Sequence, residues 1–265
     1  MKKLTKEAFG EWAVITGASS GIGREMARIV AQKGINTILV ARDKDALTTL
    51  SLELEKDSNI KTKVIVADLS REEEIDKVIS QCNQLEVGLL INSAGYALSG
   101  EFTENSLTDE LDMLNVNVKA PLMLSHHFAK KMKERKRGGI IFLSSIMALA
   151  GASKWANYNA TKAHNLLLAE GITRELKKDN VKVLAMIVGP VKSGFQERSN
   201  TKSAFWSMSP QRVAKYGLWM LGCRSTYVPG LINKFIALTT RLNPRIINSY
   251  IFSGVVKRLT SRRGV

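Results

Sequence analysis

The chain has 265 residues, of which 45% are hydrophobic and 24% are charged, a composition typical of a soluble globular protein with one large α/β domain or two small ones. Its net charge of +15 is concentrated near the C-terminus, because residues 198–265 hold twelve Lys or Arg and no Asp or Glu. Cys82 and Cys223 have no metal-binding or redox spacing, which favours a reduced, cytoplasmic setting. No segment has the length and polarity of a signal peptide or the ~18 apolar residues of a membrane span.

Short apolar runs alternate with helical periodicity along the chain. The runs predict strands at Trp12–Thr16, Thr37–Val40, Val64–Val66, Val87–Ile91, Ile140–Leu143 and Val181–Val188. The periodic segments predict helices at Gly21–Lys33, Asp43–Lys56, Glu72–Asn83 and Asn157–Lys178, with two more within Asn105–Arg137. Because the strands are apolar on both faces, the pattern predicts an α/β fold: a doubly wound parallel sheet of Rossmann type with helices on both faces. We expect one domain over residues 1–230 and a basic helical extension over residues 231–265.

A glycine-rich segment, TGASSGIG, connects the first strand to the first helix. Its glycines would let the backbone approach a pyrophosphate, and the helix would offer its N–H groups and positive dipole end. Arg24 and Glu25 stand where an ATP-binding loop has Lys and Ser or Thr, so ATP is disfavoured. A glycine-rich turn can also serve packing alone. The candidate dinucleotide contacts are Gly17, Ser19, Ser20, Gly21, Ile22 and Gly23.

Arg42 follows the second strand, where NAD-selective folds often place an acidic residue on the ribose hydroxyl. A guanidinium there could pair with a 2′-phosphate, so NADP(H) is favoured over NAD(H). The adjacent Asp43 weakens this preference, and an exposed arginine starting a helix is the alternative.

Tyr158 and Lys162 are four residues apart in a predicted helix, and Ser145 precedes Tyr158 by thirteen positions. Residues at i and i+4 share one helix face, so the phenol and the ammonium would project together. The ammonium should lower the tyrosine pKa and so tune a phenol for proton transfer. An ordinary surface helix could carry the same two residues, so the pair alone does not distinguish a catalytic site from a surface helix.

Further motifs follow one another in order along residues 10–230. They are VADLS with Asp68, the run Asn92-Ser93-Ala94-Gly95, NVNV with Asn117, and VGPVKS with Val191 and Ser193. Together with the glycine loop and the Ser145, Tyr158 and Lys162 set, they resemble the short-chain dehydrogenase/reductase family. Ser93 replaces the family's second Asn, Val188 replaces a proline, Ser193 replaces a threonine, and Gly88 stands where the family often has Asp, which should loosen entry to the fourth strand.

The resemblance implies a role for each matching position. Tyr158 would be the proton donor, Ser145 would hydrogen-bond the substrate carbonyl, and Lys162 would hold the ribose hydroxyls. Asn117 would orient a water beside Lys162. The cofactor contacts implied are Asp68 on the adenine, Asn92, Ala94 and Gly95 after the fourth strand, Tyr158 and Lys162 themselves, and Val191 and Ser193 beside the nicotinamide carboxamide. The resemblance also implies a homo-oligomer, a dimer or tetramer, formed by the helices around residues 105–137 and 157–178.

Aromatic and sulfur-containing side chains near these motifs predict an apolar substrate. Those flanking the expected cleft are Met147, Trp155, Phe195, Phe205, Trp206 and Met208. His126 and His127 point to different faces of a helix, and no metal site is expected.

The acid-free tail predicts a local anionic partner or a docked helical extension. Leu231, Phe235, Leu238 and Leu242 recur on one helical face, Pro244 ends that helix, and a second amphipathic segment spans Arg245–Leu259. Four alternatives remain for the tail. It could dock on its own domain or on a partner subunit, lie on an anionic membrane surface, bind a charged carrier, or, least favoured, bind nucleic acid.

The sequence therefore predicts an NADP-dependent carbonyl reductase, reversibly an alcohol dehydrogenase, acting on an apolar small molecule in the cytoplasm or at the periphery of a membrane. Within this function, 3-oxoacyl or ketosteroid-like compounds are the alternative substrates. A cofactor-binding protein without turnover, with a regulatory or membrane-scaffolding role, is the alternative function.

Overall fold

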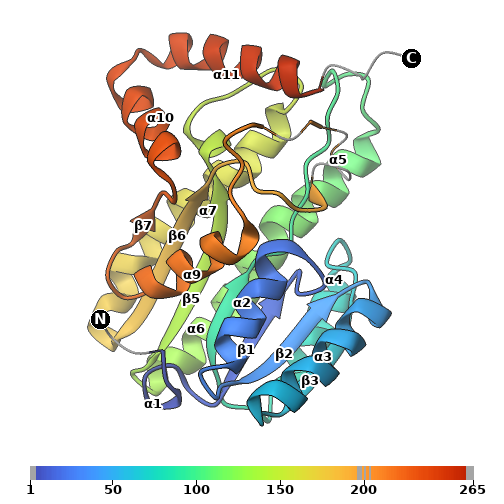
Figure 1. Cartoon of the computed structure of the whole chain (residues 1–265), viewed down its shortest axis with the longest axis vertical. Helices are drawn as coiled ribbons and strands as arrows, with labels where there is room; N and C mark the ends of the chain where they lie inside the picture. Colours follow the sequence, from blue (N-terminus) through green and yellow to red (C-terminus); the bar gives the residue numbers. More distant parts are fainter. Residues whose placement is uncertain (1–3, 196–198, 200, 203, 261–265) are drawn as a thin grey trace.

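A seven-stranded parallel sheet forms the centre of the protein (Figure 1). The computed structural model describes residues 4–195, 199, 201–202 and 204–260. The strand order is β3-β2-β1-β4-β5-β6-β7. The strands are β1 (Trp12–Thr16), β2 (Asn36–Ala41), β3 (Thr62–Val66), β4 (Val87–Asn92), β5 (Gly138–Ser145), β6 (Val181–Val188) and β7 (Thr226–Tyr227).

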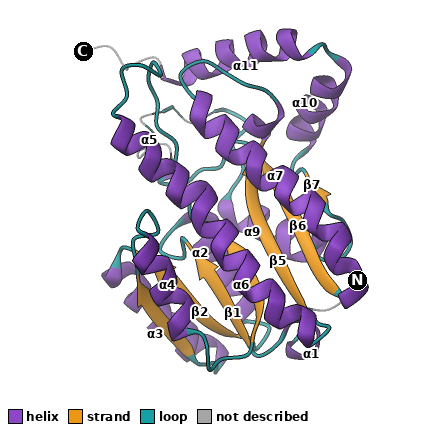
Figure 2. Cartoon of the chain, turned by 180° about the vertical axis from the view of Figure 1, so that it is seen from behind, coloured by secondary structure: helices purple, strands orange, loops and turns teal. Residues whose placement is uncertain are grey.

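Helices cover both faces of this sheet and bury its apolar strands in two hydrophobic cores. One face packs against α2 (Gly21–Ala31), α3 (Lys44–Ser58) and α9 (Pro210–Met220). The other packs against α4 (Glu72–Gln81), α6 (Ala120–Glu134) and α7 (Ala156–Leu176), as seen from behind in Figure 2. The predicted doubly wound Rossmann-type fold is confirmed.

Two local elements differ from the prediction. A four-residue helix, α1 (Lys6–Phe9), precedes β1 and was not expected, because four residues are too few to show periodicity. The two helices expected within Asn105–Arg137 are α5 (Leu107–Leu114) and α6, and a π-helical segment (Asn115–Lys119) joins them directly. Such segments often occur at functional sites.

The start of β4 is irregular at Gly88, while the loosening expected there stays a prediction. Trp12 pairs with Val87 while the next residue, Ala13, pairs with Leu89, so the ladder skips Gly88. A Cβ at position 88 would lie 1.8 Å from the carbonyl oxygen of Phe9. The glycine is therefore required where the chain leaving α1 crosses β4.

The order of the strands creates a crevice between β1 and β4. The chain runs outward from β1 through β2 and β3 and returns to β4 on the other side of β1. In open α/β sheets, ligands bind at such a switch point, beyond the carboxyl ends of the strands. Thr16 ties these two strand ends together, because its Oγ1 accepts hydrogen bonds from the backbone N–H groups of Ser93 and Ala94, each at 3.1 Å.

The C-terminal extension forms two helices, α10 (Leu231–Leu242) and α11 (Arg245–Thr260), above the carboxyl ends of the central strands (Figures 1 and 2). Of the alternatives for this tail, docking on its own domain is observed. Phe252 and Val256 of α11 are buried in the core, and the Oγ of Ser253 accepts a hydrogen bond from the backbone N–H of Ser153. Within the described part of the chain, no helix combines the length and apolar character needed to cross a membrane.

Candidate active site

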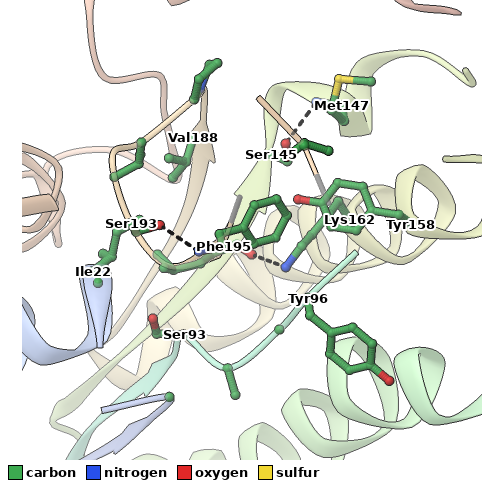
Figure 3. Close-up of a pocket in the computed structure, with 18 of the residues that line it drawn as sticks. Ile22, Ser93, Tyr96, Ser145, Met147, Tyr158, Lys162, Val188, Ser193 and Phe195 are labelled. Carbon is green, nitrogen blue, oxygen red and sulfur yellow. Dashed lines mark hydrogen bonds between the residues drawn. The ribbon is translucent and has the colours of Figure 1, made fainter. Parts of the chain in front are cut away.

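A cavity of about 1070 Å³ opens at the carboxyl ends of the strands. Its walls come from the segments after β1, β2, β4, β5 and β6, from α7, and from α10 and α11. Figure 3 shows part of its lining, with Tyr158, Lys162 and Ser145 close to Phe195. The loops that are expected to hold a dinucleotide and the side chains that are expected to be catalytic therefore line the same cavity.

The glycine loop has the backbone geometry that its sequence predicts. Gly17 and Gly21 adopt φ angles of +66° and +57°, in the left-handed region that favours glycine. A Cβ at Gly23 would lie 2.4 Å from the carbonyl oxygen of Gly17, so α2 begins against the loop. Gly17, Ser19, Ser20, Gly21 and Ile22 line the cavity. This loop therefore presents close backbone and the N-terminus of a helix to a ligand phosphate.

Arg42 lies at the rim of the cavity, after β2. Its side chain is 70% exposed, with Nη1 3.9 Å from an Asp68 carboxylate oxygen. The neighbouring Asp43 is the N-cap of α3, and its Oδ1 accepts a hydrogen bond from the backbone N–H of Ala46 at 3.0 Å. The carboxylate that weakened the NADP(H) prediction is thus engaged in starting a helix.

The segment after β4 only partly matches its prediction. Ala94 and Gly95 line the cavity, as does Ser93, which was not a predicted contact. Asn92, a predicted cofactor contact, does not line the cavity. Its side chain is buried, and its Nδ2 donates to the Oγ of Ser125 at 2.9 Å. It braces β4 against α6. A Cβ at Gly95 would lie 3.0 Å from the Lys162 amino group, so this backbone passes directly beside the lysine.

Asn117 lies behind the backbone at Gly95, near the Lys162 amino group. It is fully buried in the π-helical segment, and its side chain does not line the cavity. Its Oδ1 accepts from the backbone N–H of Tyr96 at 3.1 Å, and its Nδ2 donates to the Tyr96 carbonyl at 2.9 Å and to the Thr161 hydroxyl at 3.0 Å. Asn165 donates to the Asn117 backbone carbonyl at 2.8 Å. With these groups engaged, Asn117 holds the Tyr96 segment against α7, and its role in orienting a water beside Lys162 stays a prediction.

Ser145, Tyr158 and Lys162 meet at one buried point of the cavity (Figure 3). Ser145 ends β5, and the other two lie one turn apart near the start of α7. The Ser145 Oγ accepts a hydrogen bond from the backbone N–H of Met147 at 3.1 Å. The amino group of Lys162 donates to the Leu143 carbonyl at 3.2 Å and lies 5.8 Å from the centroid of the Tyr158 ring.

Burial, and not the neighbouring ammonium, dominates the ionisation of this pair. Desolvation raises the pKa of Tyr158 to about 12, with the Ser145 hydrogen bond acting in the opposite direction. Desolvation lowers the pKa of Lys162 to about 8. The net pKa of Tyr158 is therefore raised in the cofactor-free protein, and not lowered as expected. The phenol is protonated at neutral pH, which is the form that a proton donor requires.

Aromatic side chains enclose Tyr158. The ring centroids of Trp155 and Phe195 lie 5.3 and 5.9 Å from that of Tyr158. Trp155 is fixed by a hydrogen bond from its Nε1 to the Ser99 hydroxyl at 2.7 Å. Beyond these rings, the cavity is lined by Leu98, Met147, Ala204, Trp206, Ile236, Ile251, Phe252, Val255 and Leu259. This half of the cavity suits an apolar molecule.

The loop after β6 joins the two halves of the cavity. Val191 and Ser193 line it, and the Ser193 Oγ accepts from the backbone N–H of Phe195 at 3.4 Å. Gly189 contacts Asn233 of α10 so closely that a Cβ would lie 2.2 Å from the Asn233 Oδ1. Asn233 is 2% exposed and donates to the Pro229 carbonyl at 2.8 Å. The tail is therefore packed onto the loop predicted to meet the nicotinamide.

Comparison with known proteins identifies the family. The profile of the short chain dehydrogenase family matches residues 11–204. The chain belongs to this family. Its members are oxidoreductases that bind a nicotinamide cofactor and act on small molecules, so the chain is an oxidoreductase of this type.

Three relatives of this short-chain dehydrogenase illustrate the match. A 7β-hydroxysteroid dehydrogenase of Clostridium sardiniense is 28% identical over 232 residues, 86% of this chain and 89% of the relative. A very-long-chain 3-oxoacyl-CoA reductase of Laccaria bicolor is 27% identical over 255 residues, 83% of this chain and 75% of the relative. The structure of a short-chain dehydrogenase from Sphingobium yanoikuyae in complex with NADPH superposes with a TM-score of 0.80 at 25% identity, covering 96% of this chain and 98% of that one.

Sequence reasoning missed the contribution of the tail to this dehydrogenase's cavity. Leu231 and Phe235 lie on the apolar face that the sequence predicts, but both are exposed, while Ile236 lines the cavity. Phe205 is 91% exposed and Met208 does not line the cavity. In the described residues, no group of three or more His, Cys, Asp or Glu side chains could hold a metal ion.

Proposed function

We propose that this short-chain dehydrogenase transfers a hydride between NADP(H) and the carbonyl or secondary alcohol of an apolar small molecule, with Tyr158 as the general acid/base. The observation that carries the proposal is the meeting of Ser145, Tyr158 and Lys162 where the glycine-loop half of the cavity joins its apolar half. The cofactor supplies the hydride, and the protein supplies orientation and a proton.

The residues present fit a dinucleotide. The positive φ angles of Gly17 and Gly21 and the start of α2 form a phosphate cradle. The backbone at Gly95 leaves room beside Lys162, whose ammonium would hold the ribose hydroxyls. Asp68 would accept from the adenine amino group, and Val191 and Ser193 would meet the carboxamide.

Each member of the buried set has one role. Tyr158 donates its phenolic proton to the carbonyl oxygen of the substrate during reduction, and accepts a proton in the reverse direction. Ser145 donates a hydrogen bond to the same oxygen. The lining of one cavity by both residues supports this role. The positive charge of Lys162 favours the phenolate that forms when the proton leaves.

NADP(H) is the proposed cofactor because of charge at the rim. Arg42 is exposed after β2, where it could pair with a 2′-phosphate, while Asp43 is engaged as a helix cap. The NADPH in the structure of the Sphingobium yanoikuyae relative supports this choice.

Large apolar ketones are the proposed substrate class. Trp155, Phe195 and Phe252 form apolar walls, and such a cavity excludes water from the reacting carbonyl. The names of two relatives, a hydroxysteroid dehydrogenase and a very-long-chain 3-oxoacyl-CoA reductase, point to ketosteroid-like or 3-oxoacyl compounds.

We further propose a homo-oligomer, a dimer or tetramer, that works in the cytoplasm or at the periphery of a membrane. The helices expected to associate carry exposed leucines in the structure. These are Leu107, Leu111 and Leu114 of α5, Leu122 of α6 and Leu167 of α7. Nucleic acid is not a proposed partner.

Replacing Tyr158 with phenylalanine tests the proposal. We expect kcat for NADPH-dependent reduction of a panel of bulky ketones to fall by roughly 10²–10⁴-fold, since a positioned acid contributes about that much. NADPH binding, followed by fluorescence, should persist. Tyr216→Phe, at a position outside the cavity lining, is the matched control.

Two results would contradict the proposal. Turnover that survives in Tyr158→Phe would remove this residue from the chemistry. A wild-type protein that binds NADPH but reduces none of the ketones would favour a cofactor-binding protein with a regulatory or scaffolding role.

A further inference from the structure

Two consecutive helices, α10 and α11, expose an unusual number of large apolar side chains. Each of these side chains is at least 45% exposed, and we call the set the outer face. It consists of Leu231, Ile232, Phe235, Leu238 and Leu242 of α10 and Ile246, Ile247, Tyr250 and Ile251 of α11. Figure 1 shows both helices at the end of the molecule beyond the strands, drawn in red. Soluble monomers rarely expose large apolar patches without a partner.

The outer face is distinct from the face that holds these helices on the domain. In α10, Asn233 and Ile236 contact the domain, while Leu231, Phe235 and Leu238 lie on a separate stripe. In α11, the buried stripe consists of residues spaced four apart, Asn248, Phe252 and Val256. Each helix is thus apolar on two sides. Packing against the domain buries the inner side of each helix. The outer side stays exposed and is available to a partner.

The charge around the outer face selects the kind of partner. Neither helix contains an acidic residue, and the basic residues of the two are Lys234, Arg241, Arg245, Lys257 and Arg258. A second copy meeting this face across a two-fold axis would bring two cationic surfaces together, which is unfavourable. An anionic lipid surface complements both features, because it accepts apolar side chains at the headgroup boundary and attracts Lys and Arg.

We propose that the outer face docks on the surface of an anionic lipid bilayer. Its apolar side chains enter the boundary between headgroups and acyl chains, and the basic residues of α10 and α11 meet the phosphates. Ile251 is half exposed and also lines the cavity. Docking would therefore place the wall of the apolar half of the cavity at the bilayer. Binding to vesicles needs neither substrate nor turnover, so the proposal stands or falls independently of the catalytic function.

Co-sedimentation of the full chain with vesicles tests this surface. We expect binding to vesicles of phosphatidylcholine with phosphatidylglycerol, weaker binding to phosphatidylcholine alone, and weakening by salt. Phe235→Glu/Leu238→Glu should reduce the binding constant at least about tenfold, because two apolar anchors become anions facing an anionic surface. Leu52→Glu is the control, since Leu52 is 65% exposed on α3.

A second variant keeps the test decisive if the first misfolds. Arg241→Glu/Arg245→Glu changes only exposed residues and should lose the preference for phosphatidylglycerol. Vesicle binding that is unchanged in these variants, or equally lost in Leu52→Glu, overturns the proposal. So does a result in which Phe235→Glu/Leu238→Glu dissociates an oligomer, measured by light scattering, without changing vesicle binding.

Discussion

Replacing Lys162 with methionine should stabilise the cofactor-free fold at neutral pH while removing activity. Burial lowers the pKa of this lysine from the ordinary value of 10.5 to about 8. At about 1.4 kcal/mol per pKa unit, holding the charged form destabilises the native state by about 3 kcal/mol at pH 7. The lost hydrogen bond to the Leu143 carbonyl would offset about 1 kcal/mol. We therefore expect a net gain of about 2 kcal/mol in the free energy of unfolding.

The dependence on pH separates this effect from packing. Below pH 8, both the folded and the unfolded state hold the lysine proton, so the destabilisation is complete. Between pH 8 and 10.5, the unfolded state binds more protons, so the stability contributed by this group rises with pH and the advantage of the variant shrinks. Urea unfolding of both proteins from pH 7 to 9.5 measures the difference. The range stops below pH 10, because the raised pKa of Tyr158 makes the native state lose stability above that point.

Lys178→Met, at an exposed position after α7, provides the control and should show no such trend. A Lys162→Met variant that is no more stable than the wild type at pH 7, or whose advantage is the same at pH 7 and 9.5, would refute the burial argument.

Three further substitutions test the cofactor rim, the strand entry and helix α7. Arg42→Glu should lower kcat/KM with NADPH at least about tenfold and leave NADH little affected, since it removes a phosphate partner and adds a like charge; equal losses with both cofactors would contradict the role of Arg42. Gly88→Ala should lower the free energy of unfolding by roughly several kcal/mol, because the added Cβ would lie 1.8 Å from the Phe9 carbonyl oxygen and overpack the crossing. Gly171→Ala, inside α7 with no atom within 4 Å of the added Cβ, should instead stabilise it by about 0.5–1 kcal/mol in the same thermal or urea measurement.

The sheet could be predicted because buried parallel strands are continuous apolar runs bounded by turns. Six runs identified β1 to β6 with small shifts at the ends, and the helical periodicities located the helices between them. The extra helix α1 could not be predicted, since its stability comes from Phe9 packing in the core and not from a local pattern. The π-helical junction gave no signal either, because a single wide turn does not change residue types in a recognisable way.

The site could be predicted where spacing alone places a side chain. Ser145, Tyr158 and Lys162 follow from a strand end and one helical turn, and they do meet. Asn92 and Asn117 are different, because an amide turns toward whichever partner the tertiary structure provides, here Ser125 and the Tyr96 backbone.

The raised pKa of Tyr158 could not be predicted from the sequence for a related reason. A neighbouring lysine is visible in the pattern, but the burial of Tyr158 between Trp155 and Phe195 arises only when the loop after β6 folds against the start of α7. The same limit hid Ile236, since the sequence shows that α10 is amphipathic and does not show which of its apolar sides faces inward.

The contact between Asn233 and Gly189 couples α10 to the loop that is proposed to meet the nicotinamide. The glycine has no side chain to yield, and Asn233 is buried and held by the Pro229 carbonyl. A shift of α10 must therefore move the loop that carries Val191 and Ser193. If this loop meets the dinucleotide as proposed, a partner that repositions α10 would change the affinity for the dinucleotide. Because thermodynamic coupling is reciprocal, a bound dinucleotide would change the affinity for that partner by the same factor.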